Sequence, residues 1–298
     1  MSNYILNGKT TFWRSIIKMK TIFFAVSALA LFVMTACKDP SDGTGTLPEA
    51  PLVEGGVSFI LSPEKRTITI KVKTAVGNVT VEGCEETTLT SDTEAELHAQ
   101  GTRVTLKGDI TELKCDNNQL ISLNVQGLTA LKSLECVNNR LTALNVQGLS
   151  ALQHLNCSYN KLTELNVQGL SALQYLDCSA NKLTALNVQG LNALQYLYCP
   201  KNQLTSLSVQ GLNALRFLSC AENKLTADAF KKLFDDLPQR DAGVNGWCTL
   251  YTEKDGITEG NHKDFTAPPD LAAAFNNAKN NKKWKMYKIN GKGHWVGI

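Results

Sequence analysis

The chain has 298 residues, a formal net charge of +3 and 19% charged residues. This mild balance argues against nucleic-acid binding, because such proteins concentrate basic residues on one face. The hydrophobic share of 43% is ordinary for a folded protein, and the length suits one large domain or two to three small ones.

The amino end carries an apolar run, Thr21 to Ala36, that follows Lys18 and Lys20. This is the layout of a secretory signal peptide, and the run is short for a membrane-spanning helix, which needs about 20 residues. The run ends at Cys37 after small residues, which resembles the lipobox of bacterial lipoproteins, with Met34 in place of the usual leucine. The resemblance implies cleavage before Cys37 and acylation of its thiol. The alternative is a short anchor or buried helix with an incidental cysteine.

These features predict a signal peptide over 1–36, with Met19 as the true start, followed by a lipid-anchored tether over 37–56. The tether is rich in Pro, Gly and acidic residues and has too little apolar content to fold. Its first residues, KDPSD, resemble the short signal that sends lipoproteins of some Gram-negative gut bacteria to the cell surface. The resemblance implies an outer-membrane, lipid-anchored protein, displayed on the cell surface where that signal acts.

The segment 57–109 changes to short alternating runs. Thr67 to Lys73 and Arg103 to Lys107 alternate apolar and polar residues with a period of two, as half-buried strands do. We expect a small β-rich N-terminal cap that covers the open end of the segment after residue 109.

A period of 21 residues dominates the segment 110–226, where leucine, cysteine and asparagine recur in register. The recurring residues are Leu113, Leu134, Leu155, Leu176, Leu197 and Leu218, then Cys115, Cys136, Cys157, Cys178, Cys199 and Cys220, then Asn118, Asn139, Asn160, Asn181, Asn202 and Asn223. A fixed period of this size indicates stacked units. Each unit supplies one short strand, and only stacking hides its leucines. The asparagine at each turn offers a donor and an acceptor to the buried backbone, and a glycine recurs on the return path from Gly127 to Gly211.

A typical unit, LQHLNCSYNKL at 152–162, resembles the leucine-rich repeat L-x-x-L-x-L-x-x-N-x-L, with cysteine at the third core position. The unit length and the second half, LTxLNVxGLxAL, resemble bacterial surface repeats of the internalin-related type. The stretch VTLKGDITELKC resembles the start of the repeats in gut-bacterial surface lipoproteins. The resemblance implies an α/β-type leucine-rich-repeat solenoid, dominated by strands, with a parallel sheet on its concave face.

The segment 227–298 predicts an α+β capping module, because an exposed repeat end would be apolar. Apolar residues at positions 230, 233, 234 and 237 predict a helix between Thr226 and Pro238, and a second helix is expected after Asp270. Strand-like pieces, Trp247 to Tyr251 and Trp284 to Ile289, flank the second helix. The lysines between 279 and 292 indicate a solvated face, or else contact with an anionic surface.

The six repeat cysteines are interpreted as buried core thiols, with disulfides or a metal or catalytic role as alternatives. There is neither a C-x-x-C motif nor a paired histidine spacing, which argues against zinc. Cys84 and Cys248 lie outside the repeat and have no assigned role. A nucleophile needs a nearby base, and only His262 or His294 would reach Cys248. We therefore predict no enzyme, no cofactor and no metal, and a cysteine-based enzyme remains as a third hypothesis.

The outward strand positions carry a row of rings, one per repeat. The candidate partner-binding residues on this concave face are His154, Asn156, Tyr159, Tyr175, Asp177, Tyr196, Tyr198 and Phe217. Exposed rings in a row are costly unless something covers them, and rings beside Asp and Asn suit a protein surface or a sugar. We expect a monomer that binds a protein or glycan ligand, reaches the membrane through its N-terminal lipid and binds no nucleic acid. The alternative is that the rings only stack and stiffen the sheet, in a scaffolding envelope protein without a discrete ligand.

Overall fold

The computed structural model describes residues 48–241 and 243–298, which belong to one compact unit. The predicted signal peptide, the predicted lipid site Cys37 and the first part of the predicted tether lie outside the described residues. Within the described ranges, no helix is both long and apolar enough to cross a membrane.

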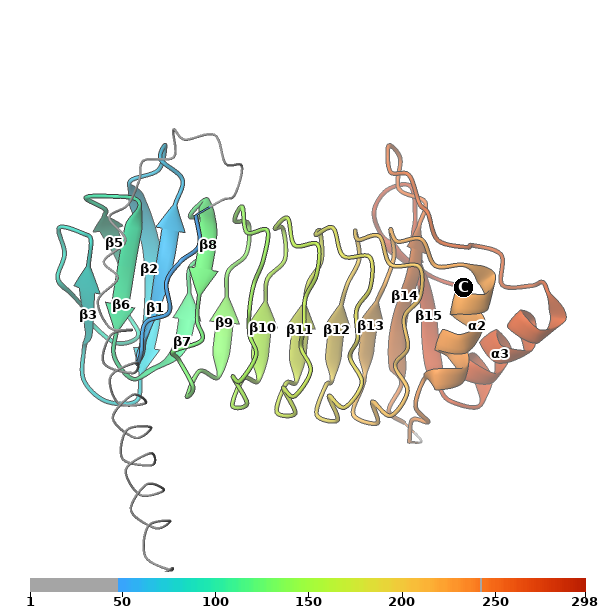
Figure 1. Cartoon of the computed structure of the whole chain (residues 1–298). Coiled ribbons are helices and arrows are strands. Elements are labelled where there is room, and N and C mark those ends of the chain that lie inside the picture. The colour runs from blue at the N-terminus through green and yellow to red at the C-terminus, as the bar shows by residue number, and fades with distance from the viewer. Residues whose placement is uncertain (1–47, 242) are drawn as a thin grey trace, which may run out of the picture. The chain divides into compact units, whose positions relative to one another are not determined.

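One long sheet runs from end to end of this unit (Figure 1). Its 11 strands have the order β16-β15-β14-β13-β12-β11-β10-β9-β7-β2-β5. The repeats supply β7 (Ile110–Lys114), β9 (Ser133–Glu135), β10 (His154–Asn156), β11 (Tyr175–Asp177), β12 (Tyr196–Tyr198) and β13 (Phe217–Ser219). These strands pair in parallel, and residues 21 positions apart face each other, as Leu155 faces Leu176. The predicted stack of short parallel strands is confirmed.

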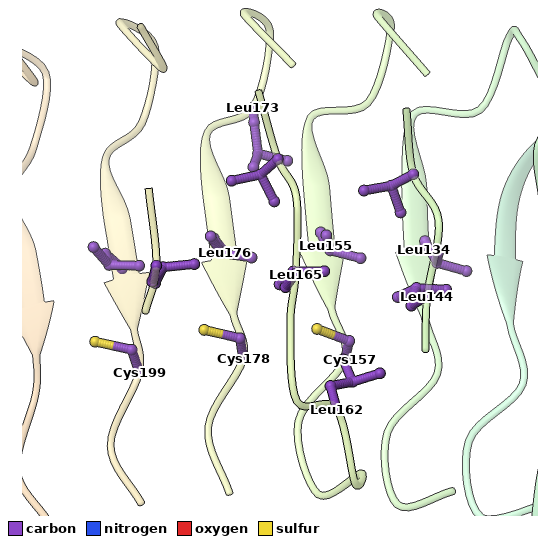
Figure 2. Packing of buried hydrophobic residues seen from close by; sticks show 14 of the residues in the cluster. Leu134, Leu144, Leu155, Cys157, Leu162, Leu165, Leu173, Leu176, Cys178 and Cys199 are labelled. Carbon is purple, nitrogen blue, oxygen red and sulfur yellow. The ribbon is translucent and has the colours of Figure 1, made fainter. Parts of the chain in front are cut away.

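Leucines and cysteines fill the interior behind the strands (Figure 2). Leu155 and Cys157 of one strand are fully buried, as is Leu162 after the turn. Figure 2 shows these side chains beside their equivalents in neighbouring units, Leu176 and Cys178 among them. Burying a leucine contributes about 1.5–3 kcal/mol. An isolated unit would leave both flanks of its leucines in water, so this stabilisation depends on stacking.

Buried asparagines tie each unit to the one before it. The Asn160 side-chain oxygen accepts from the backbone N–H of Leu141 at 3.1 Å, and its amide donates to the carbonyls of Cys136 at 2.9 Å and Cys157 at 3.1 Å. The same bonds recur one repeat later at Asn181. The expected donor-and-acceptor role of the ladder asparagines is thus present in the structure, and it spans two units rather than one turn.

The turns use two kinds of left-handed residue. Gly169 on the return path has φ +82° with open space around its Cα, so its conformation is the reason for glycine there. Gly127 differs, because a Cβ there would lie 1.8 Å from the carbonyl oxygen of Val53. Just before each ladder asparagine, a residue other than glycine takes a positive φ, for example Tyr159 at 55° and Lys201 at 57°.

The N-terminal segment folds into a second sheet that covers the first repeat. This five-stranded sheet has the order β4-β3-β6-β1-β8. Its strands are β1 (Gly56–Leu61), β3 (Val79–Glu82), β4 (Thr88–Leu89), β6 (Arg103–Lys107) and β8 (Leu120–Asn124). Two further strands extend the long sheet: β2 (Thr67–Thr74) pairs antiparallel with β7, and β5 (Glu94–His98) pairs antiparallel with β2. The first ladder asparagine, Asn118, bonds both the N–H and the carbonyl of Thr69 in β2, so the cap engages the ladder directly.

The C-terminal segment continues the parallel sheet with helices as return paths (Figure 1). Thr226 caps α2 (Ala227–Asp236), which leads to β14 (Gly246–Thr252). The helix α3 (Pro269–Asn280) then leads to β15 (Trp284–Ile289). The last strand, β16 (Trp295–Gly297), pairs antiparallel with β15 at the edge of the sheet. Asn261 ends the asparagine ladder by donating to the carbonyls of Cys220 and Leu250, each at 2.8 Å. A side chain from outside the repeats thus supplies the last set of bonds.

Candidate functional site

The outward residues of β10 to β13 form one open surface, which we call the sheet face. In each three-residue strand the middle leucine points inward, so the first and third residues point outward. The sheet face consists of His154, Asn156, Tyr175, Asp177, Tyr196, Tyr198, Phe217 and Ser219. Tyr159 is not on a strand but on the left-handed turn after β10, with 57% of its surface exposed.

The rings of the sheet face contact one another in a continuous row. His154 stacks on Tyr175 with ring centroids 4.3 Å apart and planes 12° apart. Tyr175 lies 5.5 Å from Tyr198, which stacks on Phe217 at 4.7 Å. In-register pairing accounts for the first contact, because equivalent side chains on adjacent strands lie only about 4.8 Å apart. The other two contacts join diagonal neighbours, which long aromatic side chains can reach. The ring stacking that the stiffening alternative assumes is therefore present.

The row does not end with the repeats, and its continuation was not predicted. Trp295 on β16 lies 5.8 Å from Phe217 and 6.5 Å from Tyr287 on β15, and Tyr287 lies 6.1 Å from Trp247 on β14. Sequence alternation within the predicted strands offered a signal for Trp247 and Tyr287. Their spacing departs from 21 residues, however, and nothing in the sequence links Trp295 to the repeats. We call these rings the aromatic row; its members are His154, Tyr175, Tyr196, Tyr198, Phe217, Trp247, Tyr287 and Trp295.

One predicted contact residue needs correction. Phe217 is only 8% exposed, because Tyr198 stacks on one side of its ring and Trp295 packs on the other. It supports the row rather than offering a surface. The exposed rings are Tyr196 at 39%, Trp247 at 43% and Trp295 at 53%, so the accessible part of the row lies further toward the C-terminal cap than expected.

The electrostatics of the sheet face centre on Asp177. Burial and the charge of Asp177 raise the pKa of Tyr175 to about 12, and the same two causes raise the pKa of Tyr198. Burial lowers the pKa of His154 below its ordinary value, so this ring is neutral at pH 7. The rings therefore surround one carboxylate and add no positive charge of their own.

The N-terminal end of the same sheet carries charges instead of rings. A depression of about 360 Å³ lies over β2, β7 and β9. Its lysines are matched by carboxylates: Lys73 lies 2.9 Å from Glu112, and Lys114 lies 3.1 Å from Glu135. Lys71 likewise pairs with Asp92 at 2.8 Å, so each lysine that lines this depression has a carboxylate partner.

The thiols lie in the core of the described unit. All eight cysteines of the described ranges are free and buried, and burial raises the pKa of Cys84 to about 11. Cys248 lies beside Cys220 in the core. The His262 ring, one of the two candidate bases for Cys248, bonds the carbonyl of Asp264. The same ranges contain no cluster of three or more His, Cys, Asp or Glu residues that would hold a metal ion.

The described geometry joins three observations: a 21-residue period, one inward leucine and one inward cysteine per parallel strand, and an asparagine that bonds two successive units. The fold is that of a leucine-rich-repeat solenoid. The resemblance noted in the sequence therefore extends to the three-dimensional arrangement of the repeats.

Comparison with solved structures returns bacterial leucine-rich-repeat proteins. InlJ of Listeria monocytogenes, described as including a cysteine ladder, is 28% identical over 47% of this chain and 39% of its own, with a TM-score of 0.32. The internalin InlF of the same species is 18% identical over 60% of this chain and 47% of its own, with a TM-score of 0.43. A leucine-rich-repeat protein of Leptospira interrogans is 26% identical over 54% and 44%, with a TM-score of 0.38.

The chain thus spans less than half the length of each of these three structures. No protein-family model and no curated protein matches it.

Proposed function

We propose that this leucine-rich-repeat protein binds a partner protein through the aromatic row. The observation that carries the proposal is the exposure of Tyr196, Trp247 and Trp295 along one sheet. Large exposed rings grouped on one surface are typical of binding sites, because tryptophan and tyrosine supply much of the energy of protein interfaces. The binding surface then includes the C-terminal cap as well as the repeats.

A protein partner fits this surface better than a glycan. Sugars bind the free flat face of an aromatic ring. In the repeats, His154 and Tyr175 stack face to face at 4.3 Å, and so do Tyr198 and Phe217 at 4.7 Å, so free faces remain only on rings with tilted contacts, Tyr196, Trp247 and Trp295 among them. Stacked rings present mainly their edges and, in tyrosine, a hydroxyl that donates and accepts hydrogen bonds. Apolar edges and hydroxyls side by side suit the mixed surface of a protein.

The scaffolding alternative rests on the same stacking, since rings that cover one another also stiffen the sheet. It offers no reason for the exposure of Trp247 and Trp295, which lie at the far end of the row. For this reason we prefer a binding role.

The test replaces the exposed rings and leaves Phe217 in place. The triple variant Tyr196→Ser, Trp247→Ser, Trp295→Ser and the control Val76→Ser, which removes an exposed apolar side chain from the N-terminal end, are compared with the unchanged full chain. Arrays of extracellular proteins and of glycans are probed with each protein. We expect protein hits that the triple variant loses and the control keeps, with the thermal unfolding temperature of the control unchanged.

Glycan hits with the same dependence would replace the protein partner by a sugar. Binding that survives in the triple variant would move the site elsewhere, and a complete absence of hits would favour the scaffolding alternative.

We also propose that the protein is held at the outer membrane, on the cell surface, by lipid on Cys37. The support is the apolar run that ends in small residues at this cysteine, together with the tether behind it. A single acyl chain anchors weakly, whereas several chains hold firmly. Growth with an alkyne-tagged palmitate is expected to label the unchanged chain and not Cys37→Ser. Equal labelling of both would refute acylation at this residue.

A further inference from the structure

The charged group at the centre of the aromatic row has no partner of opposite charge. Asp177 is the one ionised side chain on the outward positions of β10 to β13. None of the ion pairs found in the described residues includes it. Every other carboxylate on the neighbouring outward positions of the sheet, namely Glu112 and Glu135, is paired with a lysine.

The fold does not require this charge. One oxygen of Asp177 accepts from the backbone N–H of Ser179 at 2.9 Å and from the Ser179 hydroxyl. In the preceding repeat Asn156 makes the same two bonds to Ser158, at 3.1 and 2.7 Å. A neutral amide thus accepts the same two hydrogen bonds at this corner, so the turn after position 177 does not need a negative charge. The second carboxylate oxygen accepts no hydrogen bond within the described ranges.

Three tyrosines surround this carboxylate. Tyr198 faces Asp177 on the adjacent strand, Tyr175 precedes it by two residues on the same side of the same strand, and Tyr196 lies diagonally. Adjacent strands are about 4.8 Å apart, so a cation at Asp177 can reach the ring of Tyr198 within the roughly 6 Å over which aromatic rings attract cations. Tyr175 and Tyr196 are the next neighbours on the same face, within reach of a long side chain. Tyr196 makes only a tilted contact with Tyr175, at 6.3 Å and 38°, and its faces are free of stacked rings in the described structure.

We propose that Asp177, with Tyr175, Tyr196 and Tyr198 around it, binds one lysine or arginine side chain of the partner protein. This inference rests on the proposed function and names the chemical group that the row recognises. The carboxylate supplies a charge-assisted hydrogen bond, and the rings supply cation–π attraction and exclude water from the pair. His154, neutral beside Tyr175, does not compete for the carboxylate.

The test uses the purified full chain and a library of random peptides displayed on phage. Peptides that bind are sequenced, and one is synthesised together with a twin in which its basic residue is replaced by norleucine. Affinities are measured for the unchanged chain, for Asp177→Asn, for Tyr196→Ser, which removes one exposed ring of the aromatic row, and for Glu135→Gln, which removes one negative charge from the same sheet. Asp177→Asn copies the native arrangement at Asn156, so it is expected to fold and unfold like the unchanged chain.

We expect the selected peptides to be enriched in lysine or arginine. Asp177→Asn should weaken their binding about tenfold, an effect between those of exposed and buried charge pairs. Glu135→Gln should change it by less than about twofold, as for an exposed pair. The norleucine twin should bind the unchanged chain and Asp177→Asn equally.

Three results would overturn the inference, and they differ in what they mean for the proposed function. If Tyr196→Ser weakens peptide binding while Asp177→Asn does not, the aromatic row binds proteins without reading a cation, and the proposed function stands. If no selected peptide responds to either substitution, the proposed function falls as well. If Asp177→Asn and Glu135→Gln weaken peptide binding equally, the peptides respond to the overall negative charge of the sheet and not to Asp177 in particular.

Discussion

Removing a ladder asparagine should destabilise the protein far more than removing an exposed asparagine of the same repeat. Asn160 is 8% exposed and joins two units through its bonds to Leu141, Cys136 and Cys157. In Asn160→Ala, the fully buried backbone N–H of Leu141 loses its partner, while both carbonyls keep one bond each from the asparagines of the adjacent repeats. The orphaned N–H is therefore the main cost.

The size of the effect can be summed from the bonds that are lost. A buried donor without a partner costs about 1–3 kcal/mol, and each of the other lost bonds adds roughly 0.5–1 kcal/mol because its acceptor keeps a second donor. The sum is about 3 kcal/mol. The matched control is Asn166→Ala, in which an exposed side chain loses a 3.1 Å bond to the N–H of Gln168. Water replaces that bond, so the expected cost is about 0.5 kcal/mol.

The assay is equilibrium unfolding in urea, followed by far-ultraviolet circular dichroism. With a urea dependence of about 3 kcal/mol per molar, Asn160→Ala should lower the unfolding midpoint by about 1 M. The control should move it by less than about 0.2 M. If the two variants unfold at the same urea concentration, the asparagine ladder does not hold the units together.

Three further predictions concern the turns, the N-terminal cap and the thiols. Gly127→Ala should lower the free energy of unfolding by more than about 2 kcal/mol, because its Cβ would collide with the Val53 carbonyl. Gly169→Ala has open space for its Cβ and is strained only in φ, so in the same urea assay it should lower the free energy of unfolding by about 1–2 kcal/mol. The Glu86 carboxylate, 2.6 Å from the ring of His98, raises the pKa of that histidine, and His98 lowers the pKa of Glu86 to about 2. The stabilisation from this pair is lost as the pH rises through the raised histidine pKa and as it falls toward the lowered carboxyl pKa. NMR titration of Glu86→Gln should show the histidine pKa falling. Iodoacetamide should leave the eight cysteines of the described ranges unlabelled in the folded chain at pH 8, since they are buried, and label them in urea; rapid labelling in the folded state, detected by peptide mass spectrometry, would revive a cysteine-based enzyme.

The repeat fold followed from the sequence because its physical causes are local and periodic. Alternation within units such as LQHLNC fixes which side chains point inward, and the 21-residue step places identical side chains opposite one another. The asparagine role followed as well, since a buried corner needs both a donor and an acceptor. The helix after Thr226 matched its expected start because capping depends only on neighbouring residues.

The left-handed corners could not be predicted in the same way. The residues that precede the ladder asparagines all have positive φ: Asn117, Asn138, Tyr159, Ala180, Lys201 and Glu222. Asparagine tolerates this conformation, but the last four side chains do not favour it, and it costs them about 1–2 kcal/mol. The stacked units on either side impose it there, so the sequence holds no local signal at these four corners.

The composition of each strand determined which rings stand on the sheet face, because alternation is a property of neighbours in the chain. Only the tertiary structure decided which of those rings are accessible. Trp295 comes from the end of the cap, packs on Phe217 and removes it from the surface, while Trp247 joins the row through a helical connection of irregular length. Contacts between segments so far apart depend on how the cap closes on the last repeat, and that closure follows from packing of the whole core rather than from any repeated pattern of residues.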